Sequence, residues 1–213
     1  MTDPTEFILA NTSLIAPPLV PEVRLHLATE VVPLWRKTEE ELEAEGVPPP
    51  YWAFAWAGGQ ALSRYVLDNP ETVSGKNVLD FGSGSGLVAI AAMKATASRV
   101  LAADIDAFAG AAITENAKAN HVHIDITASD IIGSAGDWRT ILVGDMCYER
   151  PLAERLLIWL RELAQKGALV LLGDPGRSYF PKSGIEKLAA YCVETSRDLE
   201  DREIRETGVY RLL

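Results

Sequence analysis

Three alternating glycines follow a short apolar segment and form the clearest chemical pattern of the chain. Gly82, Gly84 and Gly86 come directly after residues 77–81, and a stretch with helical spacing, 86–95, begins at the last of them. Glycine allows a tight turn, and its missing Cβ atom leaves room for a ligand. The first amides of the following helix would then face that ligand. This pattern predicts a nucleoside-binding turn between a strand and a helix, although it does not choose among nucleoside cofactors.

An acidic residue immediately before the loop indicates which cofactor is bound. Asp80 ends the expected strand and can accept a hydrogen bond from a cationic amino group, directly or through water. A carboxylate is unfavourable beside a pyrophosphate because like charges repel. S-adenosylmethionine (SAM) carries an ammonium group and no phosphate. Asp80 therefore favours SAM over a nicotinamide dinucleotide.

Two further acids follow the next two expected strands. Asp104 comes after residues 98–103, where a carboxylate can bind both ribose hydroxyls, a feature shared with NAD-binding proteins. Asp130 follows residues 124–127 and can accept from an adenine amino group, while the Ile131 amide reads a ring nitrogen. Alone, Asp130 is more typical of a turn or a helix N-cap. Its place after the third expected strand, following Asp80 and Asp104 at the ends of the first two, favours adenine binding.

The segments that must position these residues alternate between strand and helix patterns. This alternation predicts an α/β fold with a mostly parallel sheet and helices on both faces. Two strand-like segments at the C-terminus have no helix between them, so they predict an antiparallel hairpin that closes the sheet. The expected strands are 77–81, 98–103, 124–127, 140–144, 167–173, 190–196 and 205–212, and the expected helices are 58–67, 86–95, 107–120, 151–165 and 182–190.

The sequence predicts a domain boundary near residue 50. Residues 1–50 are predicted to form an N-terminal extension, with extended chain around Pro17 and Pro21 and a short charged helix from Thr38 to about Glu45. Residues 51–213 are predicted to form the catalytic domain.

Composition narrows the functional classes. The chain has 213 residues, a net charge of −10 and a sequence pI of about 4.8, which disfavours a nucleic-acid partner. No apolar run approaches the roughly 20 residues that span a bilayer, so no membrane partner is expected. With only Cys147 and Cys192, a disulfide framework is not expected, and neither they nor His121 and His123 form a metal-binding motif. We expect a cytoplasmic protein without a metal.

Three segments carry a family resemblance. Residues 50–59, 78–87 and 144–149 resemble the seven-strand (class I) SAM-dependent protein-lysine methyltransferases with an Asp/Glu-x-x-Tyr/Phe motif. Within that class, the chain resembles the bacterial lysine methyltransferases of the electron transfer flavoprotein beta subunit, including residues 8–12 and 25–28. The resemblance implies a Rossmann-like sheet of order 3-2-1-4-5-7-6 with an antiparallel C-terminal strand. It also implies that Trp56 contacts the cofactor, although an ordinary core aromatic would look the same.

The methyl acceptor is predicted to enter beside Asp145 and Tyr148. Residues 140–144 should end at the carboxyl edge of the sheet, where open α/β sheets bind ligands. Methyltransferases that act on amide or adenine nitrogens often carry Pro-Pro in the following motif, and this chain does not. For a lysine acceptor, Asp145 can attract and orient the amine, and Tyr148 can supply an aromatic wall that attracts cations. Both are predicted catalytic residues, and no general base is assigned.

Other functions remain open at this point. A methyltransferase could act on a ribosomal protein or a small molecule, and a SAM-binding module could lack catalysis. A NAD-dependent oxidoreductase would need a catalytic pair such as Tyr-x-x-x-Lys, which is not convincing here. Cys147 is not expected to act as a nucleophile, because SAM transfer needs none. The oligomeric state, the target lysine and the number of methyl groups are not determined by the sequence.

Overall fold

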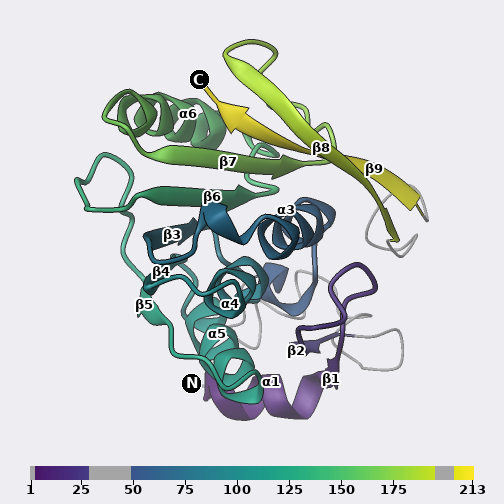
Figure 1. Cartoon of the computed structure of the whole chain (residues 1–213). Coiled ribbons are helices and arrows are strands. Elements are labelled where there is room, and N and C mark those ends of the chain that lie inside the picture. Colours follow the sequence, from purple (N-terminus) through teal and green to yellow (C-terminus); the bar gives the residue numbers. More distant parts are fainter. Residues whose placement is uncertain (1–2, 29–48, 195–203) are drawn as a thin grey trace.

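The computed structural model describes residues 3–28, 49–194 and 204–213. A seven-stranded sheet with the order β5-β4-β3-β6-β7-β9-β8 forms its centre (Figure 1). The strands are β3 (Asn77–Phe81), β4 (Arg99–Ala103), β5 (Asp125–Thr127), β6 (Thr140–Gly144), β7 (Leu169–Asp174), β8 (Ile185–Glu194) and β9 (Ile204–Leu212). Strands β3 to β7 run parallel, and β9 runs antiparallel to both of its neighbours. This confirms the predicted sheet order and its antiparallel end.

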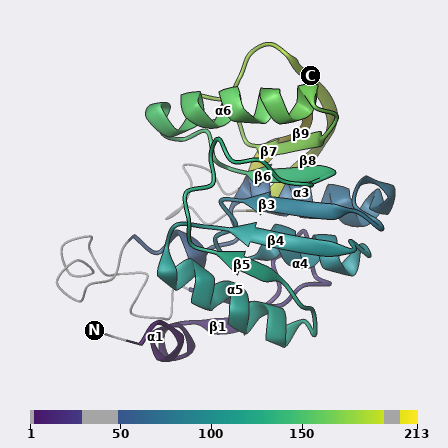
Figure 2. The same ribbon diagram turned by 90° about the vertical axis from the view of Figure 1, so that its left-hand side faces the viewer.

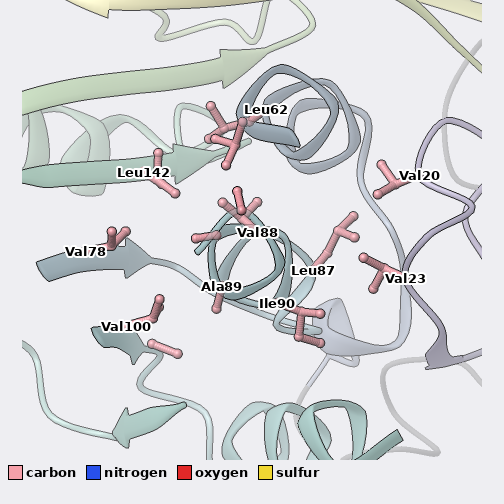
Figure 3. Packing of buried hydrophobic residues seen from close by; sticks show 14 of the residues in the cluster. Val20, Val23, Leu62, Val78, Leu87, Val88, Ala89, Ile90, Val100 and Leu142 are labelled. Carbon is pink, nitrogen blue, oxygen red and sulfur yellow. The ribbon is translucent and has the colours of Figure 1, made fainter. Parts of the chain in front are cut away.

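Helices cover both faces of the sheet, as predicted. Among the described residues, the longer helices are α3 (Ala57–Asp68), α4 (Leu87–Lys94), α5 (Ala107–Ala119) and α6 (Arg150–Gln165), and η2 (Tyr51–Ala53) and η3 (Pro70–Thr72) are short 3-10 helices. Successive side chains of a strand point to opposite faces. Val78 therefore packs with α3 and α4, whereas its neighbour Leu79 packs with α6. Figure 3 shows Leu62, Val78, Val100 and Leu142 around the apolar side chains of α4.

The helix predicted for residues 182–190 is wrong, because β8 occupies residues 185–194. The segment Leu188-Ala189-Ala190 contains good helix formers, and this local preference favoured a helix. Pairing with β9 overrides it, and a register irregularity between Lys187 and Ala189 disturbs the alternation that would have indicated a strand. The hairpin itself is confirmed, with β8 beginning earlier than expected.

The N-terminal segment contains elements that the sequence did not indicate. Helix α1 (Pro4–Asn11) is capped by Asp3, which accepts from the Glu6 amide at 3.0 Å, and β1 (Ser13–Ile15) pairs with β2 (Leu25–Leu27). Turns interrupt the expected extended chain after Pro17. Helix α1 lies beside α5 in both views (Figures 1 and 2). The helix expected from Thr38 lies outside the described residues, and the boundary at residue 50 stays a prediction.

Within the described ranges, no helix is long and apolar enough to cross a membrane. In the same ranges, no cluster of histidine, cysteine and acidic side chains is arranged to hold a metal ion.

Candidate functional site

A cavity of about 590 Å³ lies at the carboxyl ends of the parallel strands. Residues that follow β3, β4, β5 and β6 line it, together with the segment that leads into α3. Most of the residues predicted from the sequence meet here: Trp56, Gly82, Gly84, Asp104, Asp130, Asp145 and Tyr148. Asp80, Gly86 and Ile131 are not among the lining residues.

The glycine loop adopts a backbone conformation for which its glycines are suited. Gly82, Gly84 and Gly86 have φ values of 67°, 52° and 80°, in the left-handed region that favours glycine. At Gly82 a side chain would also overlap the thioether of Met146. The loop is therefore packed directly against the Asp-x-x-Tyr segment, and Gly86 begins α4 behind it.

Asp80 lies behind this loop rather than in the cavity. Its side chain is 1% exposed, and it accepts hydrogen bonds from the Ser83 hydroxyl at 2.5 Å and the Ala89 amide at 3.0 Å. Burial raises the pKa of the Asp80 carboxyl to about 7. The residue braces the loop against the start of α4, so any interaction with a ligand's ammonium group would pass through the loop or water.

Asp104 reaches the cavity and is fixed by backbone amides. Its two carboxylate oxygens accept from Gly84 at 2.8 Å and from Asp106 at 3.0 Å. The next residue, Ile105, lines the same cavity and is 75% exposed. Small-molecule pockets are lined predominantly by apolar side chains, so Ile105 is a candidate ligand contact. The sequence interpretation missed Ile105, although its place between two acids after a strand was a usable signal.

Asp130 has a structural role that is visible in the contacts. It accepts from the Ile132 amide at 3.1 Å and pairs with Arg155 at 2.8 Å, and this pairing holds its pKa below the usual value. The turn brings Ile132 to the cavity in place of Ile131. Asp130 nevertheless lines the cavity, so its contacts are compatible with both the turn and the ligand interpretations.

Asp145 is buried, and each of its carboxylate oxygens accepts hydrogen bonds. One oxygen, Oδ2, accepts from the amides of Gly58 and Gly59 at the start of α3, the latter at 3.2 Å. The other, Oδ1, accepts from Nε of Arg177 at 3.0 Å and from its Nη2 at 2.7 Å. An anionic carboxylate at a helix N-terminus is favourable because the amide dipoles point at it. The backbone of Asp145 has a positive φ of 59°, which aspartate tolerates better than most residues.

Three glycines, Gly58, Gly144 and Gly173, allow α3 to approach Asp145 this closely. A side chain at Gly58 would overlap the Gly173 carbonyl and the Asp145 carboxylate, and one at Gly173 would overlap the Gly58 carbonyl. A side chain at Gly144 would lie 3.0 Å from the Cα atom of Gly59. Gly58 at the start of α3 and the glycines near the ends of β6 and β7 are therefore packed directly against one another.

Aromatic side chains surround the mouth of the cavity. The rings of Tyr51 and Tyr148 are 5.9 Å apart, and those of Tyr51 and Trp56 are 6.1 Å apart. The Trp56 indole donates to the Tyr51 carbonyl at 2.9 Å, and the Arg177 guanidinium lies 5.7 Å from the Trp56 ring centre. Tyr51 and Tyr148 are 52% and 45% exposed. These half-exposed rings offer faces that attract a cation.

Cys147 is unsuited to nucleophilic chemistry. Its side chain is buried, and burial raises the pKa of its thiol to about 12, helped by the nearby Asp174 and Asp145. The reactive thiolate is therefore scarce at neutral pH. This agrees with the expectation that it takes no covalent part.

Comparisons with known proteins now decide the family. A family model described as "Ribosomal protein L11 methyltransferase (PrmA)" matches residues 60–140. Electron transfer flavoprotein beta subunit lysine methyltransferases are 43% identical in Xenopus laevis, over 98% of this chain and 87% of that protein, and 39% identical in Danio rerio, over 98% and 83%. The chain belongs to the family of electron transfer flavoprotein beta subunit lysine methyltransferases.

Solved structures agree with this assignment at the level of the fold. The magnesium protoporphyrin IX methyltransferase of Synechocystis PCC 6803, crystallised with SAM, has a TM-score of 0.54 at 14% identity, over 73% of this chain and 78% of that one. The ribosomal protein L11 methylase of Lactobacillus delbrueckii subsp. bulgaricus has a TM-score of 0.52 at 21% identity, over 75% and 81%. The chain is a SAM-dependent protein-lysine methyltransferase, and its cofactor is SAM.

Two buried carboxyls predict how the stability of this methyltransferase depends on pH. Burial raises the pKa of Asp80 to about 7 and that of Asp174 to about 6, whereas an exposed aspartate titrates near about 4. The folded state therefore binds more protons than the unfolded state between about pH 4 and pH 7. The stability that each carboxyl contributes is fully present below this window and is lost as the pH rises through it.

Asp80→Asn should remove the Asp80 part of this pH dependence. Relative to wild type, the melting temperature of the variant should improve as the pH rises from about 4 to about 7. Asp125→Asn is the control, because Arg99 holds the pKa of Asp125 below its usual value and its titration lies below the window. Thermal melts across the window measure both differences. If the difference in melting temperature between Asp80→Asn and wild type stayed as constant across the window as that of Asp125→Asn, the raised pKa of Asp80 would be contradicted.

Proposed function

We propose that this methyltransferase transfers methyl groups from SAM to lysine side chains of the electron transfer flavoprotein beta subunit. The observation that carries the proposal is similarity over nearly the whole chain to enzymes named for that substrate. The match to the ribosomal protein L11 family ends at residue 140, before Asp145 and Tyr148. It therefore covers the predicted cofactor-binding half and gives no reason to prefer a ribosomal protein as acceptor.

The residues of the cavity fit SAM. A cavity of about 590 Å³ is within the range of small-molecule sites, about 300–1,000 Å³. We assign Asp104 to the ribose hydroxyls, and we place the adenine between the apolar side chain of Ile105 and the turn at Asp130. The glycine loop, braced by Asp80, lies beside the methionine part. When bound, SAM supplies an electrophilic methyl group on its sulfonium.

The acceptor lysine is proposed to enter between the aromatic side chains at the mouth. Tyr51, Trp56 and Tyr148 present faces that attract an ammonium group and can hold the alkyl chain of a lysine. The lysine must lose a proton before it attacks. Because the sulfonium makes transfer easy, accurate positioning of the amine supplies most of the catalysis.

Asp145 supports the acceptor in a different way from the direct contact inferred from the sequence. A carboxylate offers about four lone-pair sites. Gly58, Gly59 and the two nitrogens of Arg177 supply four donors to it. We propose that Asp145 fixes the start of α3 and the guanidinium, and thereby the walls between which the lysine lies.

Purified components test the proposed substrate. The enzyme is incubated with labelled SAM and the purified beta subunit, and peptide mass spectrometry locates the label. We expect methyl-lysine on the subunit, and loss of labelling when the modified lysine is replaced by arginine. A subunit that stays unlabelled while the enzyme binds SAM would contradict the proposal. The cytoplasmic location and the absence of a nucleic-acid partner remain predictions from the sequence.

Asp104→Ala tests the assignment of the ribose. Hydrogen bonds to a charged group contribute about 1.5–3 kcal/mol each, so removal of the carboxylate should weaken SAM binding by about 10-fold to 100-fold. The variant should reach a normal maximal rate when SAM saturates it. Calorimetry with SAM measures the affinity, and Asp3→Ala, which loses the cap of α1 and does not line the cavity, is the comparison. Equal affinities in the two variants would contradict the assignment.

A further inference from the structure

Arg177 is a charged residue of the cavity that was not among the site residues predicted from the sequence. It follows β7 in the turn Asp174-Pro175-Gly176-Arg177 and lines the cavity. Its side chain is 18% exposed, and that of its partner Asp145 is 9% exposed. Among the described residues, the other ion pairs each have at least one side chain that is 46% exposed or more, and such pairs contribute little to stability.

The backbone of Arg177 is held by contacts that do not involve its side chain. Asp174, which is 2% exposed, accepts from the amides of Gly176 and Arg177 with one oxygen, both at 2.7 Å. Asp174 itself belongs to β7, which pairs with β6 on one side and β9 on the other. The turn is therefore anchored to the middle of the sheet.

The guanidinium then connects the two walls of the acceptor site. Its Nε and Nη2 atoms bind Oδ1 of Asp145, just after β6, and its Cζ atom lies 5.7 Å from the centre of the Trp56 ring, at the start of α3. Trp56 is joined to Tyr51 by a hydrogen bond, and the Tyr51 ring contacts Tyr148. A series of contacts thus runs from Arg177 around the mouth of the cavity to Tyr148.

We propose that Arg177 is a positioning residue for the methyl acceptor, which rests on the proposed entry of a lysine between these walls. By holding the Asp145 carboxylate and the Trp56 ring in one arrangement, Arg177 sets the direction in which the amine approaches the methyl group. A displacement of about 1 Å can cost about 100-fold in rate. Loss of Arg177 therefore lowers kcat, and it leaves SAM binding nearly unchanged because the contacts of Asp104 and the glycine loop are not altered.

The planar fork of arginine is needed for this role. Lysine keeps the positive charge but has a single ammonium group, so it cannot donate to the Asp145 carboxylate from two fixed nitrogens while its charge faces the Trp56 ring. Arg177→Lys should therefore restore part of the rate that Arg177→Gln loses.

The test compares Arg177→Gln, Arg177→Lys and the control Arg150→Gln. Arg150 begins α6, two residues after Tyr148, and forms an exposed pair with Glu154 at 2.8 Å. We measure kcat and KM for whichever protein the wild-type enzyme labels, SAM affinity by calorimetry, and folding by thermal melts. Labelling of a protein other than the flavoprotein subunit would contradict the proposed function, while the variants still decide the role of Arg177 on that acceptor.

The expected result is a kcat at least about 10-fold lower for Arg177→Gln, with partial recovery in Arg177→Lys and wild-type behaviour in Arg150→Gln. SAM affinity should stay within about 3-fold of wild type in all three. A kcat for Arg177→Gln that equals the control overturns the inference, and so does a parallel loss of SAM affinity. Where Arg177→Gln does not fold, Arg177→Lys decides: a reduced kcat with normal SAM affinity supports the role, and a normal kcat overturns it.

Discussion

Replacement of Asp145 by alanine should reduce methylation by at least about 100-fold and destabilise the fold by about 3–5 kcal/mol. The variant leaves the Arg177 guanidinium buried without its carboxylate and removes the acceptor for the first amides of α3. Breaking a buried ion pair by removing one partner is costly because the other charge stays out of water. The positive φ of 59° adds strain, since alanine tolerates this region less well than aspartate.

Asp145→Asn separates the effect of the side-chain charge from the effect of the positive φ. Asparagine accepts a positive φ about as readily as aspartate. Its amide can accept from the α3 amides or from Arg177, but it has only one oxygen, so it cannot serve both. We expect a stability and a rate between those of wild type and Asp145→Ala, measured by urea unfolding and by labelled-SAM transfer. A wild-type rate in Asp145→Asn would show that the charge of Asp145 is not needed.

Replacement of Gly58 by alanine should destabilise the fold by about 3 kcal/mol or more. The added methyl group would overlap the Gly173 carbonyl and the Asp145 carboxylate, and backbone atoms cannot rotate away as a flexible side chain can. Helix α3 would have to move outward, which opens the hydrogen bonds between its first amides and Asp145. Activity should fall with stability, because the same displacement moves Trp56.

Gly59→Ala is a closely matched control. It changes the next residue of the same helix, and its methyl group would lie 3.9 Å from the Val88 side chain, an ordinary contact. Alanine is favoured over glycine inside a helix by about 0.5–1 kcal/mol, so this variant should be as stable as wild type or slightly more stable. Urea unfolding of the two variants measures the difference. Equal stabilities would contradict the close packing of α3 on β6 and β7.

Elements of the fold were predicted correctly where their own residues show a clear pattern of apolar and turn-forming side chains. The glycine loop and strand β6 follow from the alternation of apolar segments and turns, and both lie where the sequence placed them. The short helix α1 was missed because its eight residues have only a weak apolar period, although Asp3 followed by Pro4 is a helix-start signal. The first part of β8 was predicted to be a helix because its residues favour a helix until β9 pairs with them.

The candidate site was predicted as a set of residues, but not as a set of contacts. Parallel strands end at one edge of a sheet, so Asp104 and Asp145 could be placed together from the sequence alone. The partners of Asp145 could not be predicted from the sequence, because Gly58 and Arg177 are distant from it along the chain. They meet it only through the packing of α3 and the turn after β7. The place of Asp80 behind the loop likewise depends on Ser83 and the start of α4.

The central claim, lysine methylation of the electron transfer flavoprotein beta subunit, is tested most directly in an extract of cells that lack this methyltransferase. The purified enzyme and labelled SAM are added, and labelled proteins are identified by mass spectrometry. Asp145→Asn serves as the parallel sample with reduced transfer. We predict that the flavoprotein beta subunit carries the main label, on lysine. A beta subunit that stays unlabelled, while the enzyme labels another protein or a small molecule, would contradict the claim.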